Sequence, residues 1–165
     1  GRDLFSRMLH GSYISLTVGF VAVTVSLCIG IVIGAVSGYF GRWVDNILMR
    51  VVDAVMCFPT FFLILTAVAL LGPSMFNIII VIGLVSWTGT ARLVRAEFLT
   101  LRETEYVRAA KTLGQSTPKI IFRHILPNAF ALFVTAVLGI PAAILTEAGL
   151  SFLGFGVQPP QATWG

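Results

Sequence analysis

Few residues in this 165-residue sequence could carry acid–base or metal chemistry. The candidates are His10, His124 and Glu147, which lie far apart in the chain and which we expect on opposite faces of the protein. The sequence has no GxxxxGK(S/T) loop for phosphates, no HExxH metal pair and no GxSxG nucleophile turn. An enzyme would need a nucleophile, a base or metal ligands close together. We therefore predict a protein with no catalytic residues, no metal site and no ATPase site of its own.

Charged side chains instead gather in one stretch, residues 92–128. This stretch holds seven of the 11 basic residues and three of the 7 acidic residues, a net charge of +4. The overall basic excess could also indicate nucleic-acid binding. However, the basic residues border apolar runs, where they mark the cytoplasmic side of a membrane. We therefore predict no nucleic-acid partner.

The charged stretch contains start and stop signals for two short helices. Residues 97–113 are rich in helix formers, and Gly114 follows where a left-handed C-terminal cap is usual. Ser116 or Thr117 is a suitable N-cap, with Pro118 as the first residue of the second helix. The pattern predicts two helices joined at Gly114.

Ala109 and Ala110 come just before this joint. Their small side chains would let the bend insert closely into a groove of a partner protein. An amphipathic hairpin resting on lipid headgroups is the alternative, because the stretch is basic.

The rest of the sequence has the composition of a membrane protein. Hydrophobic residues make up 57% of the chain and charged residues 11%, where a soluble domain averages about 25% charged. The mean hydropathy is +0.95. Cys28 and Cys57 lie in apolar runs without CxxC spacing, so we expect packed thiols. The apolar residues form long charge-free runs, as membrane-spanning helices require.

These runs predict an all-α bundle of transmembrane helices in a single membrane domain over residues 1–165. A polar connection at residues 42–53 separates the first two spans, and Pro59 should kink or begin the second. Gly72, Pro73 and Ser74 supply the next turn. The expected spans are residues 13–39, 54–71, 75–91 and 125–145.

Gly30, Gly34 and Gly38 recur every four residues in the first span. Such a stripe of small residues lets another helix approach closely inside a membrane. We predict a helix-packing face, with a role in a substrate pathway as the alternative.

Charge sets the expected orientation. By the positive-inside rule, residues 92–124 form a cytoplasmic loop and residues 147–165 an external tail. Glu147 would then lie at the outer end of the fourth span, where a structural or gate role is expected. The chain starts without Met, and we expect a fragment cut at both ends, with at least one further span on either side.

The sequence also argues against two other classes of membrane protein. A secondary transporter usually carries ionisable residues inside its spans, and the four expected spans contain no Asp, Glu, Lys or Arg. A membrane enzyme would need a nucleophile, a base or metal ligands close together, and His10, His124 and Glu147 are too far apart in the sequence to suggest such a group.

At the charged stretch the sequence resembles a known family. YVRAAKTLGQSTPKIIFRHILPNA is similar to the EAA loop of binding-protein-dependent ABC importer permeases, in which Glu-Ala-Ala is followed by Gly and then by Ile-x-Leu-Pro. The matching positions are Ala109, Ala110, Gly114, Leu126 and Pro127. Arg108 replaces the Glu and His124 replaces the Ile, as in the peptide/nickel branch.

Two further segments, GRDLFSRMLHGSYISLTVG and EAGLSFLGFGVQPPQATWG, resemble the C-type subunit of dipeptide and oligopeptide permeases in that branch. The resemblance implies a multi-pass protein of the bacterial or archaeal cytoplasmic (inner) membrane. It implies a second permease as heterodimer partner, two cytoplasmic ATPase subunits and a periplasmic or lipid-anchored substrate-binding protein. Cargoes in the family include dipeptides, oligopeptides, nickel and other small solutes.

The resemblance also implies a conduit that binds no cofactor, with ATP and Mg²⁺ held by the ATPases. Those subunits would dock on the EAA loop and move it as a rigid lever. The loop residues expected to take part are Glu105, Tyr106, Arg108, Ala109, Ala110, Lys111, Gly114, Pro118, His124, Leu126 and Pro127.

Overall fold

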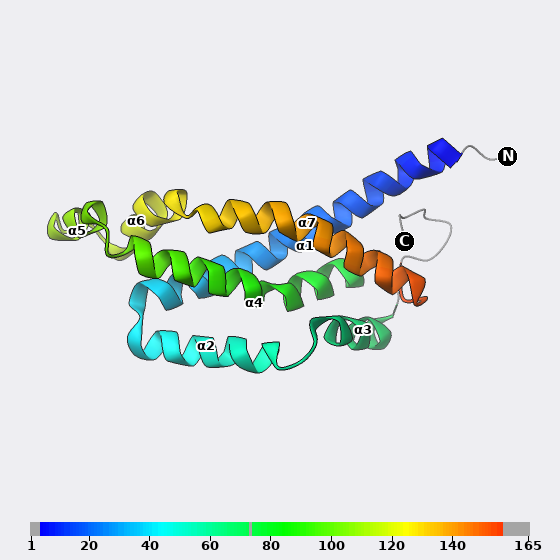
Figure 1. The fold of residues 1–165 in the computed structure, drawn as a ribbon, viewed down its shortest axis with the longest axis horizontal. Helices are drawn as coiled ribbons and strands as arrows, with labels where there is room; N and C mark the ends of the chain where they lie inside the picture. Colours follow the sequence, from blue (N-terminus) through cyan, green and yellow to red (C-terminus); the bar gives the residue numbers. More distant parts are fainter. Residues whose placement is uncertain (1–3, 73, 157–165) are drawn as a thin grey trace. The chain divides into compact units, whose positions relative to one another are not determined.

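The computed structural model describes residues 4–72 and 74–156, and this part consists of helices joined by short turns, with no strand in it. The predicted all-α class is confirmed. The elements follow in the order α1 (Leu4–Phe40), α2 (Arg42–Met56), α3 (Thr60–Leu71), α4 (Met75–Leu101), α5 (Glu105–Thr112), α6 (Thr117–Ile120), the π-helical turn η1 (Ile121–Ile125), the 3₁₀ turn η2 (Leu126–Asn128) and α7 (Phe130–Phe152) (Figure 1).

Among the described residues, three helical segments are long and apolar enough to cross a membrane. They are Met8–Phe40 in α1, Met75–Leu101 in α4 and Leu132–Phe152 in α7. The pair α2 and α3 makes a fourth candidate if the two count together as one span.

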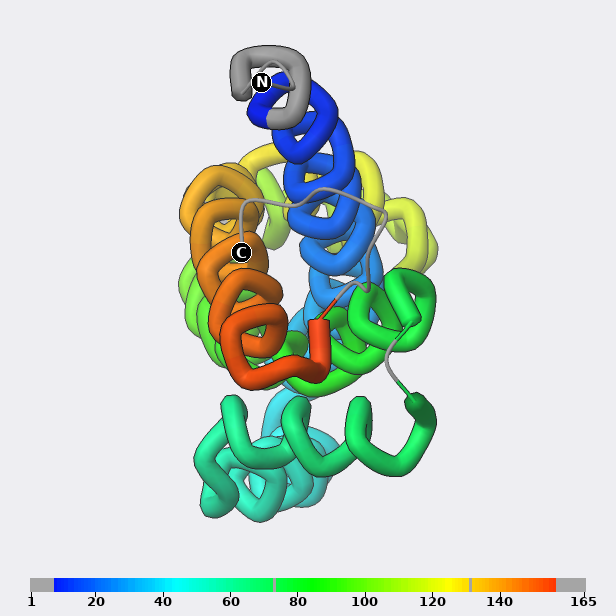
Figure 2. The backbone as a smooth tube through the Cα atoms, turned by 90° about the vertical axis from the view of Figure 1, so that its right-hand side faces the viewer, coloured from blue at the N-terminus to red at the C-terminus, as the bar shows by residue number. Residues whose placement is uncertain are grey.

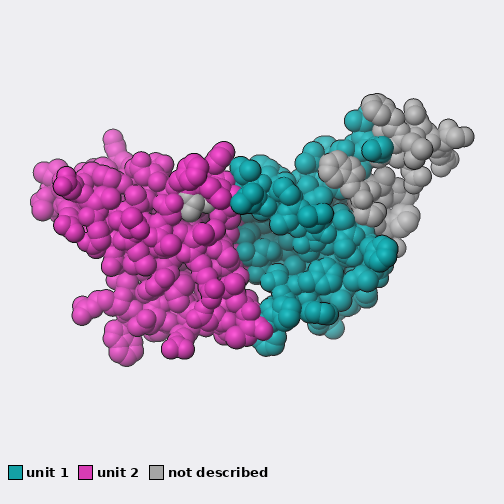
Figure 3. Space-filling model, in the orientation of Figure 1, with its two compact units in different colours: residues 1–26, 58–86, 136–165 teal, residues 27–57, 87–135 magenta. Residues whose placement is uncertain are grey.

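The chain forms two compact units (Figure 3). Unit 1 consists of residues 1–26, 58–86 and 136–165, and unit 2 of residues 27–57 and 87–135. Each of the long helices α1, α4 and α7 has one part in unit 1 and the other part in unit 2.

In unit 1, α1 and α7 lie side by side (Figure 2), and small residues sit at the contacts. A Cβ added to Gly19 of α1 would lie 3.0 Å from Ile144 Cγ1 of α7. Gly83 of α4 faces α1 in the same way, because its added Cβ would lie 2.8 Å from Val25 Cβ. Helices in a membrane associate through such close packing, since lipid provides no hydrophobic drive between them.

In unit 2, the predicted glycine stripe of α1 lies against α4. Cβ atoms built on Gly30 and Gly34 would lie 2.5 Å from Thr90 Cβ and 2.6 Å from the Ala91 carbonyl oxygen. One built on Gly38 would lie 2.6 Å from Phe98 Cβ. The core of this unit combines residues of α1, α4, α5, α6 and the following turns: Ala35, Val94, Phe98, Val107, Ala110, Ile120, Ile125 and Ala129.

The predicted polar connection at residues 42–53 is wrong, because α2 is a helix of 15 residues there. Its exposed side carries Trp43, Ile47 and Val51 at helical spacing. A single helix over residues 54–71 is also wrong, because α2 ends at Met56 and α3 begins at Thr60. Pro59 lies at the N-cap of α3, where its missing N–H costs no helical hydrogen bond.

Two other helix boundaries differ from expectation. Where an end at residue 91 was expected, α4 continues to Leu101, because Arg92 and Arg95 find carboxylate partners, Asp53 and Asp45, in α2. The last helix is Phe130–Phe152 and not residues 125–145, since Pro127 lies in the preceding 3₁₀ turn.

Those longer helices include ionisable residues. Arg92, Arg95 and Glu97 lie in α4 and Glu147 lies in α7, so the expectation that the spans contain none is wrong. The two cysteines, Cys28 and Cys57, are exposed on this chain rather than packed. The segment of the predicted external tail at residues 157–165 lies outside the described residues.

The contact between α1 and α4 leads to a direct stability test. Gly34→Ala should lower the free energy of unfolding by about 1–3 kcal/mol, because the new methyl group has no room beside the α4 backbone. Gly89→Ala on α4 is the matched control, since nothing lies within 4 Å of its added Cβ. Thermal unfolding of the full-length protein in detergent measures both. Equal melting temperatures for the two variants would contradict the close contact.

Candidate functional site

The charged stretch forms a compact end of unit 2 beyond α4. Helix α5 begins after Thr104, whose backbone is extended, and ends at Thr112. Glu105 in its first turn and Lys111 in its last turn match the helix dipole. The α5 helix is therefore stabilised locally by its own end charges.

The joint after α5 has the left-handed glycine that the sequence predicts. Gly114 has φ +72°, and its N–H donates to the Lys111 carbonyl at 3.0 Å. The Gln115 N–H donates to the Ala110 carbonyl at 3.2 Å, which closes the helix end. Nothing lies within 4 Å of a Cβ at Gly114, so its role is conformational.

The second helix of the loop is one turn long. Ser116 lies at the N-cap of α6, and Pro118 is in its first turn. The chain then continues through η1 and η2, which contain His124, Leu126 and Pro127. The predicted pair of short helices is present, but the first one starts eight residues later than residue 97, because residues 97–101 belong to α4.

A side-chain contact closes the loop across its joint. The His124 ring Nε2 and the Gln115 Oε1 are 2.9 Å apart, within hydrogen-bond distance. The His124 carbonyl in turn accepts a hydrogen bond from the Asn128 amide at 2.8 Å. His124 therefore ties the α5–α6 joint to η2.

One face of α5 is built into the core and the opposite face is exposed. Val107 is 0% exposed and Ala110 is 4% exposed, and both belong to the unit 2 core. Glu105, Ala109 and Leu113 are exposed, with Leu113 at 78%. Ala109 and Ala110 were expected to enter a partner together, but Ala110 packs inside this chain. We call the exposed residues Glu105, Tyr106, Ala109, Thr112 and Leu113 the α5 surface.

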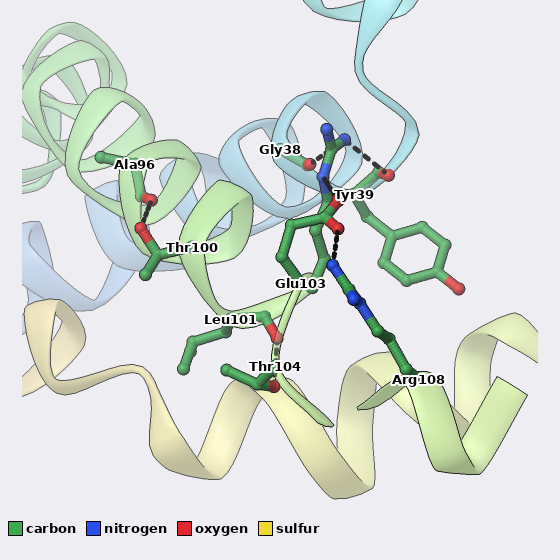
Figure 4. A network of polar contacts seen from close by, with 9 residues as sticks. Gly38, Tyr39, Ala96, Thr100, Leu101, Glu103, Thr104 and Arg108 are labelled. Carbon is green, nitrogen blue, oxygen red and sulfur yellow. Dashed lines mark hydrogen bonds and ion pairs between the residues drawn. The ribbon is translucent and has the colours of Figure 1, made fainter. Parts of the chain in front are cut away.

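Charged contacts attach α5 to the neighbouring helix ends (Figure 4). Arg108 Nη2 donates to Glu103 Oε2 at 3.0 Å, and Arg102 Nε lies 3.2 Å from Glu103 Oε1. The hydrogen bond from Arg108 holds the pKa of Glu103 below its ordinary value, with help from the charges of Arg102 and Lys111. Lys111 Nζ lies 5.2 Å from the centre of the Tyr39 ring, within range of a cation–π contact.

Glu147 lies in unit 1, away from the loop in the sequence and in a different compact unit. Its side chain is fully buried in α7, and Oε1 accepts a hydrogen bond from Ser151 Oγ at 2.8 Å. Its other oxygen, Oε2, has no hydrogen-bond partner among the described residues. The described residues also contain no cluster of three or more His, Cys, Asp or Glu side chains able to hold a metal ion.

Residues 30–165 match the family described as binding-protein-dependent transport system inner membrane component. This chain belongs to that family. The whole chain is 46% identical to the dipeptide transport system permease protein DppC of Alkalihalophilus pseudofirmus and covers 55% of that protein. It is 41% identical to the oligopeptide transport system permease protein OppC of Bacillus subtilis, of which it covers 54%.

A third relative is the glutathione transport system permease protein GsiD of Pectobacterium atrosepticum, with 40% identity and 55% coverage of that protein. The chain thus spans about half the length of the curated relatives it matches. Family membership and the three apolar helical segments agree with an inner-membrane protein.

Sequence reasoning did not find the charged contacts around Arg102 and Glu103. Both residues were counted only toward the net charge of the loop, because the end of α4 at Leu101 was not expected. The hydrogen bonds from Arg102 to the carbonyls of Gly38 and Tyr39 join segments more than 60 residues apart, and no local pattern reports such a pairing. The buried group of Ser37, Asp45 and Arg95 was missed for the same reason.

The left-handed joint gives a second testable prediction. Gly114→Val should cost roughly 1–2 kcal/mol at this residue, because a side chain with a Cβ is strained at positive φ. Hydrogen exchange at the Gln115 amide should therefore become about tenfold faster. Gly114→Asn is the matched variant and should change the rate much less, since Asn tolerates this conformation. Identical exchange in both variants would show that φ at Gly114 is not what closes the helix end.

Proposed function

We propose that the full-length protein is a permease subunit of an ATP-binding-cassette importer and forms half of its translocation pathway. The cargo class is small peptides, since the names of the relatives refer to dipeptide, oligopeptide and glutathione transport. Nickel or another small solute is the second possibility. A second permease subunit forms the other half of the pathway, and a substrate-binding protein delivers the cargo to it.

The observation that carries the proposal is the two-sided construction of α5. Val107 and Ala110 anchor one face in the unit 2 core, and the α5 surface projects its small and apolar residues outward. Leu113 is 78% exposed, and Ala109 is exposed beside it on α5. Side chains of this kind are suited to insertion into a groove of another protein. Two ATPase subunits, one on each permease, are the proposed occupants. They would hold ATP and Mg²⁺, and this chain would hold no cofactor.

The remaining loop residues have supporting positions in this proposal. Arg108 and Lys111 contact Glu103 and Tyr39 of the same chain, so their role is to hold α5 in place. Gly114, Pro118, His124, Leu126 and Pro127 shape the path from α5 back to α7. By the positive-inside rule this end of unit 2 faces the cytoplasm.

We keep the proposed gating role of Glu147, and its basis is now the burial of its side chain as well as its position in α7. Its carboxylate is buried within α7, and one oxygen has no partner among the described residues. Leaving one buried carboxyl oxygen without a partner is costly, so we propose that the gating rearrangement gives Oε2 a hydrogen-bond donor. The same residue removes one argument against a secondary transporter. Family membership now supports the ATP-driven class instead.

The docking proposal predicts different outcomes for two adjacent alanines. Ala109→Trp should reduce uptake at least about tenfold, because the indole would fill the groove that receives the α5 surface, while the protein stays folded. Ala110→Trp should instead lower the amount of folded protein, since Ala110 is in the core. Uptake and copurification of the ATPase subunits are measured with the reconstituted full-length importer.

The matched control is Ala54→Trp, at an exposed position of α2. It adds the same side chain outside the α5 surface and should leave uptake unchanged. Wild-type uptake by Ala109→Trp, with the ATPase subunits still bound, would show that the α5 surface is not the docking element.

A further inference from the structure

The C-terminal end of α1 is capped by the side chain of Arg102, the residue that follows α4. The last carbonyl groups of a helix have no partner within it and carry partial negative charge. Arg102 Nη1 donates to two of them, Gly38 O at 3.1 Å and Tyr39 O at 3.3 Å. Arg102 directly follows the end of α4, so one guanidinium group joins the ends of two long helices.

The turn after α1 is shaped to admit this guanidinium group. Gly41 has φ +63° and is buried. A Cβ added to Gly41 would lie 2.7 Å from Arg102 Nη1. The positive φ favours glycine here, and a side chain at this position would displace the tip of Arg102.

The same guanidinium group reaches toward α5. Its Nε forms an ion pair with Glu103 at 3.2 Å, and Glu103 accepts the hydrogen bond from Arg108 of α5 (Figure 4). The buried Nε has no aligned hydrogen bond among the described residues, so Glu103 serves it as a counter-charge. A continuous series of charged contacts thus runs from α5 to the last turn of α1.

This series matters because the backbone connects α1 to α5 only through α2, α3 and α4. Three residues of backbone, Arg102 to Thr104, connect α5 to α4. Contact between α5 and α1 consists of apolar packing around Ala35, the Lys111–Tyr39 contact and the Arg102 series. Apolar packing is non-directional, whereas hydrogen bonds to charged groups have defined geometry.

We propose that Arg102 is a positioning residue that fastens α5 to the C-terminal end of α1, so that a displacement of α5 moves α1 and α4 together. This inference rests on the proposed function, because it concerns the force that docked ATPases apply to α5. Without Arg102, α5 still docks and still moves α4, but the movement reaches α1 only through apolar packing and the Lys111–Tyr39 contact. The loss would be one of coupling between ATP hydrolysis and transport, not of assembly.

The test uses the full-length permease reconstituted with its partner permease, ATPases and binding protein, with labelled alanyl-alanine as the transported probe. Arg102→Met should leave the ATPase subunits bound and basal hydrolysis intact. The number of ATP molecules hydrolysed per peptide taken up should rise about tenfold, as expected from losing charged hydrogen bonds. Arg102→Lys keeps the positive charge but has a single nitrogen in place of the Nη1 and Nε that contact the α1 carbonyls and Glu103. It should give an intermediate ratio of ATP hydrolysed to peptide taken up.

If Arg102→Met fails to fold, Glu103→Gln is the deciding variant, because Glu103 is exposed and the substitution removes the negative charge that pairs with Arg102 and Arg108. It should also raise the ratio. Arg50→Gln, an exposed basic residue on α2, is the control for charge and should leave the ratio unchanged. A wild-type ratio in both Arg102→Met and Glu103→Gln would overturn the proposal, as would loss of ATPase binding in proportion to uptake. Failure of the wild-type complex to bind ATPases or take up peptide would instead refute the proposed function.

Discussion

The close approach of α1 and α4 in unit 2 is the contact on which the rest of that unit depends. Gly30, Gly34 and Gly38 have no side chains, so the α4 backbone comes within reach of α1 over two helical turns. Phe98 then lies directly over Gly38, and Val94 joins Ala35 in the core. The base on which α5 packs is set by this approach.

Ionic contacts then fix the register of the helices around that seam. Arg95 of α4 pairs with the largely buried Asp45 of α2, and Ser37 of α1 donates a hydrogen bond to the same carboxylate. Such buried pairs add little net stability relative to apolar packing, but breaking one is costly. Two turns further along α4, Arg102 holds the end of α1. The turn between α1 and α2 is therefore flanked by two contacts from the end of α4, Arg95 with Asp45 of α2 and Arg102 with the last turn of α1.

The sequence predicts those features that local physics determines. Charge-free runs predict the apolar helices, and the glycine periodicity of the first span predicts a helix-packing face, which lies against α4. The position of Gly114 after α5 predicts its left-handed conformation. Helix boundaries were less predictable, because charged residues are a poor signal for a helix end when they have partners in another helix, as Arg92 and Arg95 do.

The candidate site was predictable as a stretch but not as a surface. Ala109 and Ala110 are identical in type and adjacent, and only tertiary packing decides that one faces outward and the other enters the core. Likewise, the partners of Arg102 are backbone carbonyls of α1, which carry no sequence signal at all. Long-range contacts of this kind follow from the fold and are not visible in the residues of the loop.

The account is tested most directly by the accessibility of residue 113. A version of the full-length protein without Cys28 and Cys57 would carry Leu113→Cys and be exposed to a membrane-impermeant maleimide. We predict no labelling in intact cells, rapid labelling in inside-out vesicles stripped of ATPase subunits, and protection when those subunits are added back. Labelling from outside, or equal labelling with and without the ATPases, would contradict the claim that the α5 surface is a cytoplasmic docking element.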